Sequence, residues 1–199
     1  MLESVLSTKD NKRGYRDSMK HYEILALIRS DIHRSGGGGK YIFKNCILGR
    51  NSSHRFLFWL RLCKSDFIIV RTIARFQRVR LTRKFGLQIS ESCEIGAGFD
   101  IPHCLPIVIH NNAKIGKNCT LHQFVTIAGV DGKAPIIGNN CFIGAGAVLI
   151  GDIRIGNNVT IGANAVVLKD VPDNATVGGV PAHIIHSNNP GKYIKNAVL

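Results

Sequence analysis

Aliphatic residues recur at every sixth position through the second half of the chain. With a slip of two residues after Ile107 and four extra residues after Ile127, the six-residue units begin at Ile89, Ile95, Ile101, Ile107, Ile109, Ile115, Leu121, Ile127, Ile137, Ile143, Leu149, Ile155, Ile161 and Val167. An α-helix would require a period near 3.6, and a half-buried strand a period of two. A period of six is typical of a solenoid built from short strands and turns, so we expect a mainly β fold.

The fifth position of each unit supports this interpretation. It is apolar in every unit except the two at which the frame shifts, which begin at Ile107 and Ile127, and it is small in most units. Its apolar occupants are Cys93, Phe99, Leu105, Ala113, Cys119, Val125, Cys141, Ala147, Ile153, Val159, Ala165 and Val171. One large and one small inward residue per unit suit a narrow triangular coil with three units to the turn. Because no C-x-x-C pair occurs among the six cysteines, neither a zinc site nor a disulfide framework is predicted.

The first part of the chain has helical spacing instead. The stretch HYEILALIRSDIHR carries Ile24, Leu27 and Ile28 on one stripe, which predicts an amphipathic helix. Two further helices are predicted from SSHRFLFWLRLCK and from SDFIIVRTIARFQRVRLTRKFG, in which apolar and arginine positions alternate at helical spacing.

Polar residues and a glycine mark the expected ends of the last two helices. Ser52 or Ser53 is expected to cap the start of the first, and Ser65 or Asp66 the start of the second. Gly86 follows the second helix and is expected to end it, because glycine accepts the left-handed conformation found after many helices.

Charge divides the chain where the periodicity changes. The net charge is +13, from 26 Lys and Arg against 13 Asp and Glu, and nineteen of the cations but only six of the acids precede Phe85. The solenoid segment is therefore neutral overall. We expect a basic helical segment over residues 1–84, a β-solenoid over 85–186 and a loosely ordered tail over 187–199.

Two roles suit the basic helices. They can form a cap that packs on the solenoid and on neighbouring subunits, or their arginines and Trp59 can rest on an anionic lipid surface. No recognised nucleic-acid module accompanies the charge, so no nucleic-acid partner is predicted. No apolar run approaches the roughly 20 residues that cross a bilayer, and the first residues lack a signal-peptide pattern. We therefore expect a cytoplasmic protein, peripheral to the inner face of the membrane if the second role holds.

Four stretches of the solenoid segment resemble a known family. They are IGAGFDIPHCLPIVI, NCTLHQFVTIAG, IGNNCFIGAGAVLIGDIRIGNNVTIGANAVVLKDVP and GGVPAHII. Together they resemble the hexapeptide acyltransferases with a left-handed parallel β-helix, in particular the serine acetyltransferase-like branch, over residues 88–185. The resemblance implies a homotrimer, acetyl-CoA as co-substrate, and active sites in the clefts between neighbouring subunits.

Two histidines are predicted to meet on one edge of the solenoid. Units three apart lie on the same face, so His103 and His122 should project outward about one rung apart, roughly 4.8 Å along the stack. Gly144, Ala145 and Ala163 should follow on the same face, as a smooth strip against which a pantetheine chain can lie. The four extra residues of AGVDGKAPII are expected to bulge out beside this strip.

A histidine pair suits acyl transfer to a hydroxyl. A hydroxyl is a weak nucleophile, and a neutral imidazole can take its proton in the transition state. In the serine acetyltransferases the histidine that matches His103 is the general base, and the resemblance carries that role over, with His122 as an accessory group. We also expect Gln123 to contact the acceptor, and Ala128 and Lys169 to contact acetyl-CoA. No metal is expected, because the histidine spacing is not that of a three-histidine site.

Two positions depart from the serine acetyltransferase pattern. Gln88 stands where those enzymes have an aspartate that orients the base, and Ala134 where they have a histidine. Both changes affect the acceptor side, where Gln88 remains as a neutral contact, and they leave the donor strip intact. We therefore expect acetyl transfer from acetyl-CoA to a sugar hydroxyl of a cell-surface polysaccharide or its precursor. The alternatives are serine O-acetylation in cysteine biosynthesis and a non-catalytic scaffold.

Overall fold

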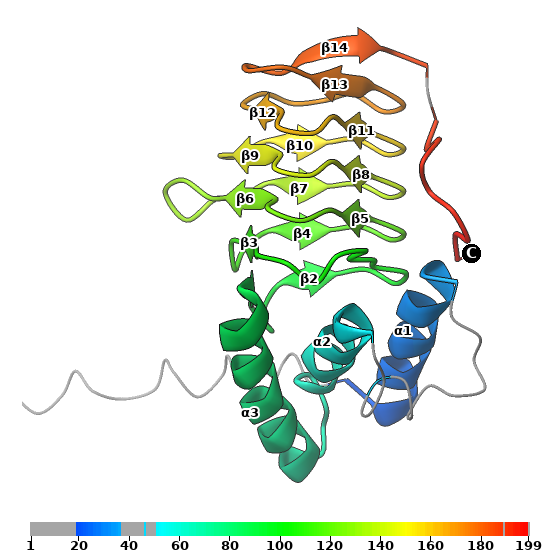
Figure 1. Ribbon diagram of the computed structural model, residues 1–199, viewed down its shortest axis with the longest axis vertical. Helices are drawn as coiled ribbons and strands as arrows, with labels where there is room; N and C mark the ends of the chain where they lie inside the picture. Colours follow the sequence, from blue (N-terminus) through cyan, green and yellow to red (C-terminus); the bar gives the residue numbers. More distant parts are fainter. Residues whose placement is uncertain (1–18, 37–45, 47–50, 189, 199) are drawn as a thin grey trace, which may run out of the picture.

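The computed structural model describes residues 19–36, 46, 51–188 and 190–198. A column of short strands stands on a base of helices, and the chain climbs the column coil by coil (Figure 1). The helices are α1 His21–Arg34, α2 Ser52–Leu62 and α3 Ile68–Phe85.

The column has three faces, and each face is a sheet of strands stacked one coil above the next. The first face holds β1 Leu87–Ile89, β3 Ile107–Ile109, β6 Thr126–Ala128, β9 Val148–Ile150 and β12 Val166–Val167. The second holds β2 Glu94–Ile95, β4 Lys114–Ile115, β7 Ile136–Ile137 and β10 Arg154–Ile155. The third holds β5 Thr120–Leu121, β8 Phe142–Ile143, β11 Thr160–Ile161, β13 Thr176–Gly178 and β14 His183–His186. Among these strands the pairing is parallel except for the antiparallel β13–β14 hairpin.

The register of the sheets confirms the six-residue period. Ile95, Ile115 and Ile137 occupy the same place in three successive coils. Each unit supplies one side of the triangle, and aliphatic side chains from the three faces fill its interior. The fold is therefore a mainly β parallel solenoid with N-terminal helices, as the sequence predicts.

One inward position is predicted wrongly. Leu105, a fifth-position residue of the repeat, is 45% exposed. The coil from Ile89 to Ile109 is two residues longer than the next, from Ile109 to Ile127. The surplus falls in the loop before β3, where the backbone leaves the triangular path, so Leu105 turns toward solvent.

A ladder of asparagines holds one corner of the column. Asn118, Asn140, Asn158 and Asn174 each have a left-handed backbone, with φ between 56° and 60°. The side-chain Nδ2 of each donates to Oδ1 of the next, at 3.1, 2.9 and 2.9 Å in turn. Asparagine tolerates this conformation better than most residues, so the ladder suits a tight corner and links consecutive coils.

A buried ion pair joins the helices to the first coil. Arg61 of α2 donates to both carboxylate oxygens of Asp31 of α1, at 2.8 and 3.0 Å. Asp31 also accepts a hydrogen bond from the backbone N–H of Phe99. Arg61 donates further to the carbonyl oxygens of Ile95 and Gly96. The helices thus close the lower end of the solenoid, with apolar side chains of α2 and α3 that join its core and with the polar contacts of this ion pair.

The helix starts differ from those predicted, and one helix end agrees. Asn51, just before the predicted serine caps, is the residue that caps α2, and its side chain accepts from the backbone N–H of His54 at 3.1 Å. Helix α3 has no side-chain cap, and both Ser65 and Asp66 precede its first turn. Gly86 ends α3 with a φ of 72°, as predicted.

The C-terminal residues run back down the side of the column. Figure 1 shows them descending from β14 toward α1. The backbone N–H of Val198 donates to Asn118 Oδ1 at 2.9 Å, and Asn118 Nδ2 donates to the Val198 carbonyl at 3.0 Å. The Asn118 side chain at a corner of the solenoid therefore holds the end of the described tail.

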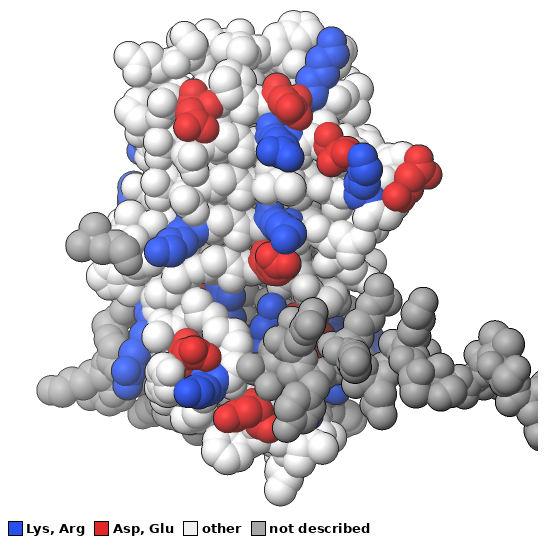
Figure 2. Space-filling model, turned by 180° about the vertical axis from the view of Figure 1, so that it is seen from behind, with Lys and Arg blue, Asp and Glu red and all other residues white. Residues whose placement is uncertain are grey.

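Charges of both signs are interspersed on the solenoid. Figure 2 shows Lys and Arg beside Asp and Glu over its surface. Two ion pairs form among these residues, between Lys133 and Asp152 at 2.7 Å and between Lys114 and Glu94 at 3.1 Å. Of the helices that the structure describes, none combines the length and apolar character needed to cross a membrane.

Candidate active site

The two histidines that the sequence pairs are neighbours in the structure. His103 lies in the loop after Ile101, and His122 follows β5 one coil higher. Their ring centroids are 5.8 Å apart and their planes are tilted by 59°. A parallel bridge between Asp100 and Thr120 keeps the two coils in register. His103 is exposed and His122 is half-buried, so solvent reaches one imidazole of the pair and the protein partly covers the other.

The surroundings of His122 favour its neutral form. Burial lowers its pKa, and the neighbouring His103 lowers it further, because two imidazolium cations would repel each other. The Asp100 carboxylate and the Gln123 side chain act in the opposite direction. A neutral imidazole beside the exposed ring can accept a hydrogen bond or a proton, which is the state that base catalysis requires.

Small residues occupy the positions stacked above His122 in the next two coils. Gly144 and Gly162 occupy its position in the next two coils, and Ala145 and Ala163 occupy the position beside it. A Cβ on Gly144 would lie 2.6 Å from the backbone nitrogen of Ala163, so the coils approach too closely here for a side chain. The predicted strip therefore exists, as a surface without long side chains next to the histidine pair.

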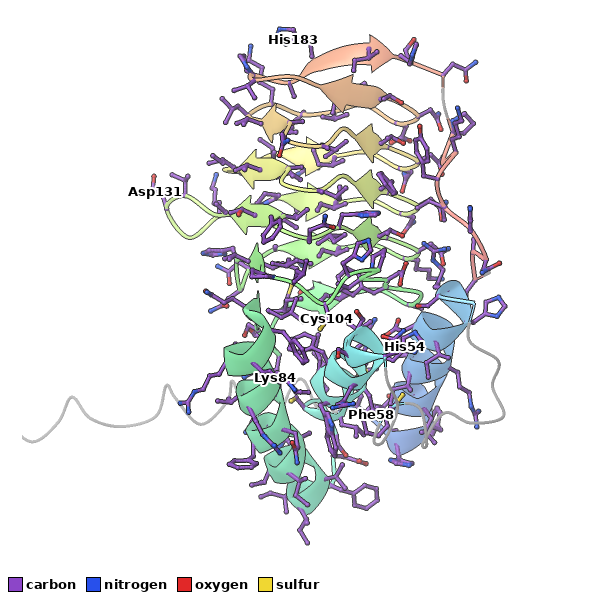
Figure 3. The ribbon with its side chains drawn as sticks, viewed as in Figure 1. His54, Phe58, Lys84, Cys104, Asp131 and His183 are labelled. Carbon is purple, nitrogen blue, oxygen red and sulfur yellow. The ribbon has the colours of Figure 1, made fainter. Side chains whose placement is uncertain are left out.

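The other predicted cofactor residues lie on a different corner. Ala128 ends β6 and Lys169 follows β12, whereas the strip follows β8 and β11. The loop with the four extra residues also leaves from this second corner, between β6 and β7, with Asp131 at its tip (Figure 3). His110 lies at the foot of that loop, against Gly129. The prediction that the loop bulges beside the strip is thus wrong within one chain, because a whole face separates the two corners.

Gln88 and Ala134 differ in their surroundings. Gln88 points outward from β1, beside Val108 of β3. In the described part of the chain it forms no hydrogen bond with His103. Ala134 is only 6% exposed and lies at the base of the loop on the second corner. Gln88 is thus exposed on the first face, whereas Ala134 is buried at the second corner.

Two aromatic residues of this site are absent from the sequence prediction. Phe142 of β8 packs against His122 with centroids 4.9 Å apart, and Tyr193 of the tail packs against Phe142 at 5.0 Å. The pairing of Phe142 with Thr120 one coil below follows from the repeat, so the register could have located it. No periodic signal places Tyr193, because it comes from the returning tail.

Cys104, next to His103 in the chain, is a poor nucleophile. It lies where the loop approaches the helices (Figure 3). Burial raises the pKa of its thiol to about 11, so the thiol stays protonated at neutral pH. Within the described ranges, no three His, Cys, Asp or Glu side chains cluster closely enough to hold a metal ion.

The chain is similar to proteins of one family. A family model described as bacterial transferase hexapeptide (six repeats) matches residues 134–169. The serine acetyltransferase of Synechococcus elongatus is 39% identical over 137 residues, which cover 67% of this chain and 54% of that one. The serine acetyltransferase of Mycobacterium tuberculosis is 40% identical over 141 residues, or 69% and 59% of the two chains. The crystal structure of Neisseria gonorrhoeae serine acetyltransferase in complex with serine has a TM-score of 0.65 and 31% identity, covering 81% of this chain and 69% of that one.

The parallel solenoid, its six-residue repeat and these matches identify the hexapeptide-repeat transferase family. The chain belongs to that family, and its relatives there are serine acetyltransferases. It spans about half the length of the curated relatives that it matches.

Proposed function

We propose that the protein is an acetyl-CoA-dependent O-acetyltransferase in which His103 is the general base. The observation that carries the proposal is the exposed His103 paired with the half-buried His122. Beside them, Gly144, Ala145 and Ala163 present no long side chain, as an extended thioester chain that lies against the backbone requires.

The mechanism needs one base and a good leaving group. A ring nitrogen of His103 takes the proton of the acceptor hydroxyl as its oxygen attacks the carbonyl carbon of the acetyl thioester. The tetrahedral intermediate then collapses, the carbon–sulfur bond breaks, and the CoA thiolate leaves and takes up the proton. His122 positions His103, and its lowered pKa keeps a second cation away from the imidazolium that forms.

The acceptor is proposed from two opposing observations. The relatives are serine acetyltransferases, which favours L-serine over the polysaccharide hydroxyl expected from the sequence. Gln88 and Ala134 favour the second candidate, a sugar hydroxyl, because they stand in place of a carboxylate and an imidazole on the acceptor side. A neutral, less crowded acceptor side suits an uncharged polyol better than a zwitterion, whose charges need partners.

The assembly proposed is a homotrimer with a site at each junction between copies. In a cyclic trimer, one corner of a copy faces a different corner of the next. Each junction would then bring the histidine corner of one chain to the Ala128 and Lys169 corner of its neighbour. There Lys169 can meet a CoA phosphate as a point charge.

The test is release of CoA thiol from acetyl-CoA, with L-serine and with a panel of free and nucleotide-linked sugars in parallel. We expect His103→Ala to lower kcat by about 100-fold or more, with the KM for acetyl-CoA little changed, because the base acts in the transition state and the strip is untouched. His33→Ala, in an exposed histidine of α1, is the matched control and should keep wild-type turnover.

Each outcome assigns a function. Release with serine alone supports a serine acetyltransferase, and release with a sugar alone supports the second candidate. Wild-type turnover in His103→Ala would contradict the assignment of the base. A wild-type protein that neither binds acetyl-CoA nor releases thiol would be a scaffold instead.

A further inference from the structure

Helix α3 carries a large apolar surface that the rest of the described chain leaves uncovered. We call it the α3 apolar face, and it consists of Ile68, Ile69, Ile73, Phe76 and Val79. Their exposed fractions are 67, 73, 49, 70 and 39%. Single exposed apolar residues are common, but a contiguous group of large ones marks an interaction surface.

The helix is held by its opposite side. Ala74 and Leu81 are buried and lie about half a turn away from the α3 apolar face at helical spacing. Figure 1 shows α3 at the outer edge of the helical base, beside α2. The α3 apolar face therefore points away from the molecule and cannot reach the core without unfolding.

The same helix is strongly basic. It contains Arg71, Arg75, Arg78, Arg80, Arg83 and Lys84, and no acidic residue. The first three point back to the protein: Arg71 donates to the Ser65 carbonyl and Arg75 pairs with Glu91, as does Arg78. The other three are exposed.

A basic hollow adjoins this surface, between α2 and α3. Its volume is about 190 Å³, and its lining includes Arg55, Arg80, Lys84 and Trp59. Arg80 and Lys84 lie on the same helical stripe as Ile73, about two and three turns along. The hollow therefore places several cations beside exposed apolar side chains, a combination that matches a phosphate head group above acyl chains.

We propose that the α3 apolar face docks on an anionic lipid surface, with a lipid phosphate between Arg80 and Lys84. Charge favours this occupant over a second copy of the chain. A contact between two α3 helices would oppose cation to cation, and the solenoid offers no concentrated negative surface in the view of Figure 2. The exposed isoleucines favour lipid over nucleic acid, which offers them little apolar surface. This inference does not depend on the proposed acetyl transfer.

The test is co-sedimentation of the full chain with phosphatidylcholine vesicles, with and without about 30% phosphatidylglycerol. We expect binding to the anionic vesicles, weakened by added salt because exposed charges are screened. The triple variant Ile69→Ser, Ile73→Ser and Phe76→Ser should bind the anionic vesicles at least about ten-fold more weakly than wild type. Its fold should survive, because all three side chains are largely exposed.

A matched variant distinguishes vesicle binding by the α3 apolar face from nonspecific binding by any exposed apolar residues. Val180→Ser, Ile184→Ser and Ile185→Ser remove equally exposed apolar side chains at the other end of the column and should bind like wild type.

A second pair of variants tests the charge. Arg80→Gln with Lys84→Gln should lower binding by about ten-fold. Lys117→Gln with Lys195→Gln, which removes two exposed lysines outside α3, should not.

Three results would overturn the proposal. The first is absence of binding to anionic vesicles, and the second is equal loss in the α3 triple variant and its apolar control. The third is a lower molar mass of the α3 triple variant by light scattering without vesicles, which would make the α3 apolar face an interface between copies.

Discussion

His54 is an ionisable ring enclosed at the base of the molecule, on α2 (Figure 3). It is 8% exposed, and burial lowers its pKa, with Asp100 and Asp31 acting in the opposite direction. Because its pKa is lower in the folded than in the unfolded chain, the unfolded chain binds more protons below about pH 6.5. Stability from neutral His54 is therefore present at neutral pH and is lost as the pH falls.

His54→Gln should make the protein less sensitive to acid. We expect the free energy of unfolding of wild type to fall from about pH 7 to about pH 5, and to fall less in the variant, which has nothing to protonate there. Urea unfolding at both pH values measures the difference. His33→Gln, at an exposed position of α1, should follow wild type, and an equal fall in all three proteins would contradict the prediction.

The asparagine ladder shows how one repeated element combines two local requirements. Each rung needs a residue that accepts a left-handed backbone, and each also needs an amide that donates upward and accepts from below. Glycine meets the first requirement and alanine meets neither. The two contributions at Asn140 can therefore be separated by substitution.

Asn140→Ala should destabilise the solenoid by about 2–4 kcal/mol, because it loses two ladder hydrogen bonds and strains the backbone. Asn140→Gly should lose about half as much, because it removes the hydrogen bonds alone. Thermal or urea unfolding measures both. Asn164 has a φ of 57° and an exposed side chain, so the same two substitutions at Asn164 are the control for the backbone contribution. Equal losses in Asn140→Ala and Asn140→Gly would rule out a backbone contribution.

Across the whole molecule, the predicted site residues fall into two groups on separate corners. His103, His122 and the strip form one group, and Ala128 and Lys169 belong to the other. A single chain cannot bring them to one ligand, because the solenoid is rigid between its corners. Under the proposed trimer, every site is shared between two copies.

Mixing two inactive variants tests this sharing. His103→Ala removes the base, and Ala128→Trp should block the donor side of the opposite corner. If sites form between copies, refolding an equal mixture should restore activity at about one quarter of the junctions, where both intact corners meet. Thiol release from the mixture measures it. Activity no greater than in the separate variants, at the same molar mass, would place each site within one chain.

Much of the fold and of the histidine site follows from the repeat. The six-residue period predicts the stacking of Ile95 on Ile115, and the same arithmetic brings His103 within a rung of His122. It fails at Leu105, because a two-residue surplus can fall anywhere in a coil and the pattern does not say where the loop leaves the triangle. It also puts the four-residue loop beside the strip, although the loop leaves from the other corner.

The sequence by itself determined the solenoid, its coil length and the neighbouring histidines, because each depends on a short-range period that alternates buried and exposed positions. Only the tertiary structure decided that Asp31 is buried against Arg61, that Tyr193 reaches Phe142, and that one face of α3 is uncovered. These features depend on contacts between segments far apart in the chain. Such contacts are set by how whole elements pack, and no local pattern of apolar and polar residues specifies them.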